Sequence, residues 1–370
     1  MTKATVSAIT QDNRGSDEPY PMIPQQFDLV TLCGLQDDEE IGDAKIPVMG
    51  FEDVGNPFVA KVDPDYVFSR GQLRTLNAFF TAPYGDFLWV WGPKGAGKTS
   101  SIQQFAGRLN WPVQHCTGRE RMEYADLVGQ WMLIRGEWEW LDGPLTTAVR
   151  HGHVFLLDEA DTLSPGELVG LNALRENGNL VIAEKGGEVI VPHKSFRLVI
   201  TANSAGNGDM TGEYQSVVQQ NSALRDGFRF IKIGYPSIET EEAILRRKVR
   251  QLDNATLELD GSPALFNGAP IDLLQGLTKL ATDIRQLYLG SDDRPGEITT
   301  PISTRTLIRW ARLLLMFSRG RGALKFSFDH AFGDGLDETD AVRLHQAAEL
   351  VFGKGQNDKS IWSEATVRIS

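Results

Sequence analysis

The feature that most constrains the fold is a glycine-rich segment, GPKGAGKT, at residues 92–99. An apolar run at 86–91, DFLWVW, comes before it and predicts a buried strand, while SSIQQFAGRL at 100–109 predicts a helix after it. Glycine lets the backbone turn with positive φ and approach a ligand closely. A glycine loop between a strand and a helix is an arrangement that binds phosphate groups. The segment therefore predicts an α/β core with a phosphate site.

Each loop position has a predicted role in that site. Backbone N–H groups and the dipole of the following helix would surround the phosphates, Lys98 would reach the β- and γ-phosphates, and Thr99 would ligate Mg²⁺. A chance match to this spacing is the alternative, and the flanking strand and helix argue against it. The predicted nucleotide-binding residues are Gly92, Pro93, Lys94, Gly95, Ala96, Gly97, Lys98, Thr99 and Ser100.

The rest of the chain repeats the alternation of strand and helix. Further apolar runs predict strands at 111–117, 153–161, 196–204 and 228–236. The pattern predicts a helix at 164–177 and a hairpin at 179–192 that turns at Gly186 and Gly187. Near-continuous apolar strands alternating with helices are typical of a parallel sheet covered on both faces. The predicted fold class is thus an α/β nucleotide-binding core.

The pattern changes after Pro236. Helical spacing of apolar residues dominates four segments, at 238–252, 271–289, 303–318 and 338–352. A chain of 370 residues can form two or three domains with cores of their own. We expect an N-terminal extension at 1–45 that is mobile or docks on a partner, a large α/β domain at 46–237, a small all-helical lid domain at 238–355 and a C-terminal tail at 356–370.

Charge and cysteine content limit the function classes. The net charge of −12 disfavours a protein that coats nucleic acid, and the cluster RRKVR at 246–250 is more typical of a solvated helix face. Two cysteines make no disulfide framework and fit a reducing cytoplasm. Apolar runs such as LLLMF at 313–317 are too short to span a bilayer, and no apolar leader is visible. His151 and His153 lack an evident third metal ligand.

A pair of acidic residues ends one of the predicted strands, in VFLLDEA. Asp158 would hold the metal through its water shell, and Glu159 would orient or deprotonate an attacking water molecule. Ligands bind at the carboxyl ends of parallel strands, which is where this pair lies. The alternative is a pair that only solvates the end of the strand. Asp161 is read as a solvated residue or one that supports the pair.

Four further polar residues are candidates for the same chemistry. Asn203 ends the strand VITAN and would hold the attacking water or the γ-phosphate, unless it only caps the strand. Arg305 lies in the first turn of a predicted helix, where a cation opposes the helix dipole, and this indicates an anionic target rather than solvent. Arg225, with Arg229 as the second choice, would reach a neighbouring subunit's γ-phosphate, unless both form interface salt bridges.

These motifs in this order resemble AAA+ ATPases, and two predicted hairpins resemble the MoxR branch. The first lies in GQWMLIRGEWEWLDGPL at 129–145, where exposed aromatic residues would grip a substrate or simply pack; the second is at 179–192. Within the branch the chain resembles the CobS-like ATPase subunits of aerobic cobaltochelatases. The stretches that carry this resemblance are VDPDYVFSR, GRLNWPV, ADLVGQ, TANSAGNGDMTGEYQSVVQQN and ISTRTLIRWA. It covers about residues 45–330, although LRDGF at 224–228 reverses the order of arginine and aspartate usual at the finger.

The resemblance implies ATP and Mg²⁺ as cofactors and ATP sites at the subunit interfaces of a ring or spiral, which is expected to be hexameric. It implies a partner with a von Willebrand A domain that the ring remodels, and in cobaltochelatase the insertion of Co²⁺ into a corrin precursor. Two other functions stay open. One is a nucleic-acid motor or regulator on a mobile element, and the other is a filament that binds ATP but rarely hydrolyses it, against which Glu159 argues.

Overall fold

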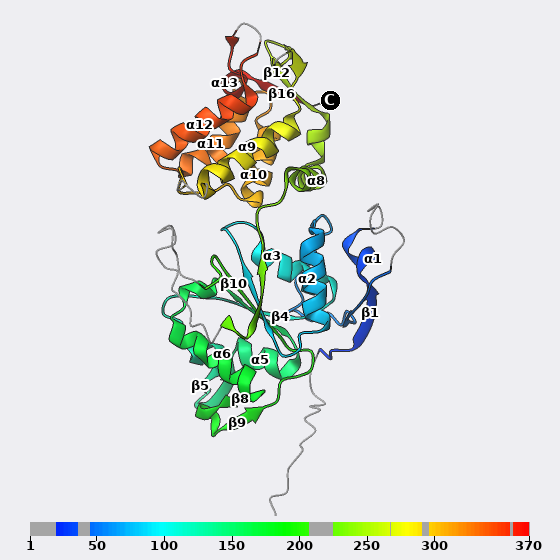
Figure 1. Cartoon of the computed structure of the whole chain (residues 1–370), viewed down its shortest axis with the longest axis vertical. Coiled ribbons are helices and arrows are strands. Elements are labelled where there is room, and N and C mark those ends of the chain that lie inside the picture. The colour runs from blue at the N-terminus through cyan, green and yellow to red at the C-terminus, as the bar shows by residue number, and fades with distance from the viewer. Residues whose placement is uncertain are drawn as a thin grey trace, which may run out of the picture.

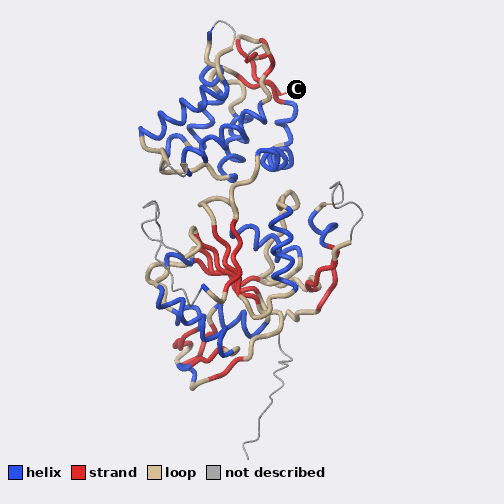
Figure 2. The backbone as a smooth tube through the Cα atoms, in the orientation of Figure 1, coloured by secondary structure: helices blue, strands red, loops and turns tan. Residues whose placement is uncertain are grey.

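The computed structural model describes residues 20–35, 45–206, 225–266, 268–290, 296–355 and 358–369. Figure 1 shows two lobes stacked along the long axis of the molecule. The lower lobe, here called the large lobe, contains the central sheet, and the upper lobe, here called the lid, is mostly helical (Figure 2). A single segment of chain after β11 (Phe228–Lys232) connects the two lobes (Figure 1).

A parallel sheet of five strands forms the centre of the large lobe, in the order β11-β3-β10-β7-β4. Every neighbouring pair in it is parallel. The other four strands are β3 (Phe87–Trp91), β4 (Val113–Thr117), β7 (Val154–Asp158) and β10 (Arg197–Ala202). The predicted α/β parallel sheet is thereby confirmed. Since all five strands run the same way, their carboxyl ends meet at one edge, which faces the lid (Figure 1).

Side chains alternate across the sheet and feed two separate cores. On β3, Leu88 and Val90 pack with α2 (Arg70–Thr81) and α3 (Lys98–Arg108), while Trp89 packs on the opposite face. The helices on that opposite face are α4 (Tyr124–Val128), α5 (Pro144–His151) and α6 (Pro165–Asn177). Burial on both faces is the reason these strands read as continuous apolar runs.

Two hairpins lie at the end of the large lobe remote from the lid. The first pairs β5 (Gly129–Ile134) with β6 (Glu137–Asp142), and the second pairs β8 (Leu180–Ile182) with β9 (Glu188–Ile190). The indole Nε1 of Trp131 donates a hydrogen bond to the carbonyl oxygen of Glu184 at 2.9 Å, so the hairpins are joined to each other.

The predicted extension at 1–45 is partly folded onto the large lobe. Within it, β1 (Pro24–Asp28) pairs with β2 (Pro47–Phe51), and α1 (Leu29–Cys33) follows β1. Leu29 and Cys33 are buried in the same core as α2 and α3. The expectation that the extension is mobile or docks on a partner is therefore wrong for residues 20–35, because their apolar side chains complete this core.

The lid differs from the predicted all-helical domain. It contains α8 (Ile238–Lys248), α9 (Leu273–Leu289), α10 (Thr304–Met316), α11 (Ala323–Ala331), α12 (Glu338–Phe352) and α13 (Ile361–Glu364). It is not all-helical, because β12 (Ala255–Leu259) pairs with β13 (Ser262–Pro263) and with β16 (Thr366–Ile369). A short pair of β14 (Leu265–Phe266) and β15 (Ala269–Pro270) adds to this part.

Residues 358–369 belong to the lid rather than to a separate tail. Trp362 is 1% exposed, and its ring lies against that of Trp310 of α10 with centroids 6.0 Å apart. Burying an aromatic side chain of this size stabilises a domain by about 2 kcal/mol or more. None of the helices in the described part of the chain combines the length and apolarity that crossing a membrane requires.

Candidate functional site: a pocket between the large lobe and the lid

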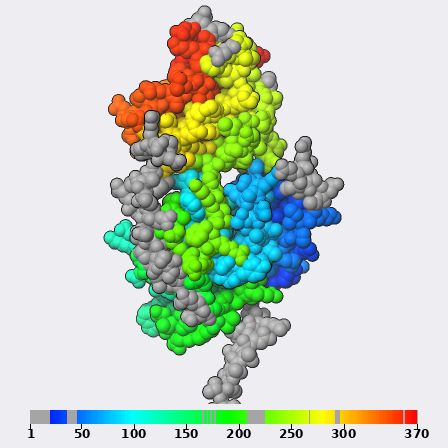
Figure 3. Space-filling model, viewed as in Figure 1, coloured from blue at the N-terminus to red at the C-terminus, as the bar shows by residue number. Residues whose placement is uncertain are grey.

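A cavity of about 1300 Å³ lies at the waist between the two lobes (Figure 3). Its floor is the loop at 94–100 together with the carboxyl ends of β7 and β10, and its roof is the start of α10. Seven of the nine predicted loop residues line it, as do Asp158, Glu159, Asn203 and Arg305. The structure thus brings together side chains predicted separately from distant parts of the sequence.

Three glycines give the loop its shape. Gly92, Gly95 and Gly97 all have positive φ, at 150°, 77° and 89°. A Cβ atom on Gly92 would lie 1.9 Å from the carbonyl oxygen of Ile233, and one on Gly95 would lie 2.6 Å from Cβ of Ser303. Gly97 then caps α3, whose first residue is Lys98. Glycine is required here both for the turns and for the close approach of the lid.

Lys98 lies at the centre of the floor. Its Nζ donates hydrogen bonds to the carbonyl oxygens of Gly92 and Pro93, at 2.8 and 3.1 Å, and to Oδ1 of Asn203 at 3.0 Å. Burial lowers the pKa of Lys98, and the nearby carboxylates of the acid cluster oppose that shift. Gly92 and Pro93 thus serve through their carbonyl groups, beneath the lysine rather than in the lining of the cavity.

The carboxylate of Asp158 is held by three neighbours. Thr99 donates to its Oδ1 at 2.7 Å, Thr201 of β10 donates to the same oxygen, and Nε2 of His115 lies 3.7 Å from Oδ2. Burial alone would raise the pKa of Asp158, but the neighbouring His115 and the hydrogen bonds from Thr201 and Thr99 outweigh it and lower the pKa to about 2. A hydroxyl and an ionised carboxylate within hydrogen-bond reach are the hard oxygen donors that Mg²⁺ prefers, so this pair fits the metal.

Glu159 has an unusual backbone. Its φ and ψ are 54° and 40°, in the left-handed region, and its N–H donates to Oγ1 of Thr201 at 3.3 Å. A non-glycine residue in this conformation costs about 1 kcal/mol or more, and such strain is concentrated at functional sites. The carboxylate of Glu159 is exposed at the cavity, where it can contact a water molecule.

The sequence left the role of Asp161 open and did not single out Thr201 or His115 for this cluster. Asp161 is fully buried, and its Oδ2 accepts a hydrogen bond from the backbone N–H of Asn203 at 2.6 Å, which fixes the end of β10 beside the acid pair. Burial raises the pKa of Asp161. Thr201 precedes Asn203 by two residues, and its hydroxyl donates to Asp158 at the end of β7, so the alternation along VITAN was the available signal. His115 had no comparable signal, because its neighbour Asp158 lies on another strand.

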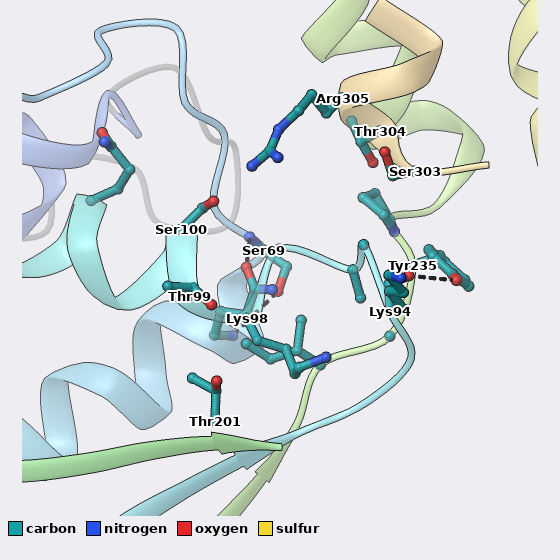
Figure 4. A pocket seen from close by; sticks show the side chains of 18 of the residues that line it. Ser69, Lys94, Lys98, Thr99, Ser100, Thr201, Tyr235, Ser303, Thr304 and Arg305 are labelled. Carbon is teal, nitrogen blue, oxygen red and sulfur yellow. Dashed lines mark hydrogen bonds between the residues drawn. The ribbon is translucent and has the colours of Figure 1, made fainter. Parts of the chain in front are cut away.

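The lid contributes Arg305. Ser303 caps α10 by accepting from the N–H of Thr306 at 3.1 Å, and Arg305 lies in the first turn that follows. Figure 4 shows its guanidinium extending from the lid across the cavity toward Ser100. A flexible exposed cation aimed at a phosphate-binding loop can contact the terminal phosphate of a bound nucleotide.

Comparison with known families identifies the two lobes. The model of the AAA domain (dynein-related subfamily) matches residues 88–220, and the CbbQ/NirQ/NorQ C-terminal model matches residues 267–350. The chain is an AAA+ ATPase of the MoxR branch. The first match contains the phosphate loop and the acid pair, and the second contains the start of α10 with Arg305. The cavity therefore lies between the two regions that the family models match.

Curated relatives of this ATPase match over most of its length. The aerobic cobaltochelatase subunit CobS of Sinorhizobium sp is 28% identical, over 81% of this chain and 84% of that protein. Protein CbbQ of Hydrogenophilus thermoluteolus is 29% identical over 52% of this chain and 69% of its own. The denitrification regulatory protein NirQ of Pseudomonas aeruginosa is 28% identical over 70% of this chain and 81% of its own.

The two arginines predicted as fingers lie outside the nucleotide cavity of their own chain. Arg229 is engaged within the subunit: its Nε donates to Asp86 at 2.7 Å, its Nη2 donates to Pro83, and it covers the ring of Tyr84. Arg225 instead lies over the ring of Phe230, with Nε unpartnered. Arg229 is thus the weaker choice, because a finger must be free to reach a neighbouring subunit.

Among the described residues, no group of three or more His, Cys, Asp or Glu side chains is close enough to hold a metal ion, and His151 and His153 have no third ligand of these types there. Their rings lie 5.9 Å apart, and Nδ1 of His153 contacts the side chain of Gln114 at 3.0 Å. His153 is part of the interior beside α5.

Proposed function

We propose that this ATPase hydrolyses ATP with Mg²⁺ in a homo-oligomeric ring or spiral, of six subunits, and uses the energy to remodel a protein partner. The observation that carries the proposal is that one cavity is built from both lobes. The phosphate loop and acid pair come from the large lobe, and Arg305 comes from the lid. Loss of the terminal phosphate would remove the anion that both lobes contact, so hydrolysis changes the relative position of the lobes.

The residues divide the chemical work. Lys98 and the loop N–H groups bind the β- and γ-phosphates, while Thr99 and Asp158 hold Mg²⁺, which neutralises phosphate charge when bound. Glu159 accepts a proton from the attacking water or orients it, and Asn203 positions that water or the γ-phosphate. Arg305 stabilises charge on the γ-phosphate from the lid.

Arg225 supports the oligomer. It lies outside the cavity of its own chain, and the Nε atom of its guanidinium has no hydrogen-bond partner among the described residues. An arginine supplied by a neighbour is worth roughly 10³-fold or more in kcat in phosphoryl-transfer enzymes. We propose Arg225 as that finger, with Arg229 held in reserve, and a ring in which each subunit completes the next one's site.

The proposed partner carries a von Willebrand A domain, as the resemblance to CobS-like subunits implies. The names of the relatives support an assembly with other proteins, because CobS is named a cobaltochelatase subunit and NirQ a regulatory protein. A nucleic-acid motor is the second candidate, and the net charge of −12 weighs against it. Two free thiols, Cys33 and Cys116, fit a cytoplasmic location.

The test is a substrate trap. Glu159→Gln keeps the size of the side chain but cannot accept a proton, so we expect normal ATP affinity with hydrolysis slowed by about 100-fold or more. The trapped, ATP-loaded protein is used to capture partners from a lysate of the source organism, which mass spectrometry then identifies. Lys98→Ala, expected not to retain ATP, is the matched control and should capture nothing in an ATP-dependent manner.

Three outcomes separate the candidates. A von Willebrand A protein together with a large corrin-binding subunit supports a cobaltochelatase motor. The von Willebrand A protein alone supports another remodelling function of the MoxR type. Recovery of only nuclease-sensitive DNA and its proteins would overturn the proposal in favour of the nucleic-acid motor, and near-normal hydrolysis by Glu159→Gln would refute the role of that residue.

A further inference from the structure

A chain of side-chain contacts links the phosphate loop to the start of α10. It consists of Tyr235, in the segment that joins the lobes, Arg285 of α9, Glu241 of α8 and Thr304, the first residue of α10. None of these residues was singled out by sequence motifs. Together they are called the lid relay.

The core of the lid relay is a buried ion pair. Arg285 donates to both carboxylate oxygens of Glu241, at 2.6 and 2.8 Å, and the two side chains are only 3% and 1% exposed. Its remaining Nε donates to the carbonyl oxygen of Ile302 at 2.9 Å. A bidentate pair that is fully enclosed has fixed geometry, and leaving either charge alone would be costly. Arg285 therefore holds the backbone that enters α10 in a fixed position.

Both ends of the lid relay reach the nucleotide site. On the lid side, the hydroxyl of Thr304 donates to Oε1 of Glu241 at 2.8 Å, and Thr304 is the residue before Arg305. On the other side, the guanidinium of Arg285 lies over the ring of Tyr235, 4.7 Å from the centroid. The hydroxyl of Tyr235 donates to the carbonyl oxygen of Lys94 at 2.8 Å, and Lys94 belongs to the phosphate loop (Figure 4).

The lid relay is anchored where the two lobes come closest. A Cβ atom on Gly95 would overlap Ser303, so the loop and the entry to α10 are already in contact. The contacts of the lid relay therefore end close to both functional groups. On the lid side they reach Ser303 and Thr304, the two residues before Arg305, and on the other side they reach Lys94 of the phosphate loop. A shift of the phosphate loop would be transmitted through Tyr235 and the ion pair to the helix that presents Arg305.

We propose that Tyr235 and Thr304 are positioning residues that act through the Arg285–Glu241 pair to set Arg305 against the terminal phosphate. This inference rests on the proposed role of Arg305 and adds the device that makes that role geometry-dependent. The lid relay should therefore affect the kcat of ATP hydrolysis and not the affinity for ADP, because ADP lacks the terminal phosphate that Arg305 contacts in this proposal. The alternative is that the same contacts only stabilise the lid.

The test uses two variants that leave the buried ion pair intact. Tyr235→Phe keeps the ring under Arg285 but removes the hydroxyl that reaches Lys94, and Thr304→Val keeps the shape but removes the bond to Glu241. Each is expected to lower the kcat of ATP hydrolysis by about fivefold to tenfold, with ADP affinity and melting temperature unchanged. Tyr84→Phe and Thr282→Val remove hydroxyls from exposed and half-buried positions outside the site and should leave kcat at the wild-type value.

The decisive measurement repeats both variants in an Arg305→Ala background. If the lid relay acts through Arg305, neither substitution lowers kcat further there. Equal losses in both backgrounds, or parallel falls in ADP affinity and melting temperature, would overturn the proposal in favour of lid stabilisation, and so would full activity of both variants. Failure of the proposed function is separate, because it would show as absence of ATP binding by the wild type or as capture of DNA alone.

Discussion

Nζ of Lys98 donates a hydrogen bond to Oδ1 of Asn203 at 3.0 Å, joining the phosphate loop to the end of β10. The backbone N–H of Asn203 is held in turn by Asp161 at 2.6 Å. The acceptors that Lys98 contacts are therefore neutral amide and carbonyl oxygens, and the carboxylate of Asp161 contacts Asn203 instead of the lysine. The positive charge of Lys98 remains available to an anionic ligand that enters the cavity.

Replacement of Lys98 tests that arrangement. Lys98→Ala removes charge-assisted hydrogen bonds to phosphate, and at about 1.5 kcal/mol for each of two bonds the affinity for ATP should fall by about 100-fold. Titration with a fluorescent ATP analogue measures the change, and exposed Lys45, replaced by alanine, is the control for loss of a surface charge. Unchanged affinity in Lys98→Ala would contradict the assignment of the loop.

Thr201 offers a sharper test of the metal site. Its hydroxyl donates to the carboxylate of Asp158 and accepts from the backbone N–H of Glu159, so Thr201→Val removes both hydrogen bonds without changing the size of the side chain. We expect kcat to fall by about tenfold and half-maximal activity to require more Mg²⁺, since one hydrogen bond to a charged group is lost. Hydrolysis measured across a Mg²⁺ titration checks this, with Thr81→Val as the control. A loss of kcat with an unchanged Mg²⁺ requirement would show that Thr201 supports Glu159 but not the metal site at Asp158.

Arg225 can be tested by mixing inactive subunits. Arg225→Ala and Lys98→Ala should each abolish most hydrolysis, but a mixed oligomer contains interfaces with an intact loop from one subunit and an intact finger from the other. Activity should therefore reappear on mixing, which a coupled phosphate-release assay detects. If mixing restores nothing, the finger does not act between subunits.

Arg229→Ala should instead lower the free energy of unfolding by less than about 1 kcal/mol, because its ion pair with Asp86 is partly exposed.

His153 predicts how stability depends on pH. Burial, followed by the neighbouring His151 and His193, lowers the pKa of His153 to about 4, so the folded state keeps it neutral. The unfolded chain binds a proton there near its ordinary pKa of about 6.5, so the free energy of unfolding falls as pH drops below that value. Between pH 7.5 and 5.5 the loss should be about 1 kcal/mol.

Denaturant unfolding at the two pH values measures this loss. The variant His153→Phe keeps an aromatic ring of similar size but cannot titrate, so its dependence on pH should be weaker by that amount. The same dependence in wild type and variant would show that other groups are responsible, such as His345, whose pKa is also lowered by burial.

The sequence alone determined the loop, the acid pair and the polar residue at the end of β10, because each depends on local order: a glycine turn between strand and helix, and carboxylates at a strand end. The parallel α/β core followed from apolar runs that need burial on both faces. Arg305 could also be predicted from the sequence, since its place in the first turn of a helix is a local property.

The tertiary structure alone decided which residues support those groups. Thr201 and Asp161 act on the site through hydrogen bonds to segments far away in the sequence, and His115 lies beside Asp158 on a neighbouring strand, so their partners are set by the order of strands in the sheet. Arg229 was a plausible finger until the fold placed Asp86 beside it. Residues 358–369 were assigned to a tail because their strand pairs with β12, far away in sequence. The lid relay could not be foreseen for the same reason, since its members become neighbours only when α8, α9 and α10 pack against the phosphate loop.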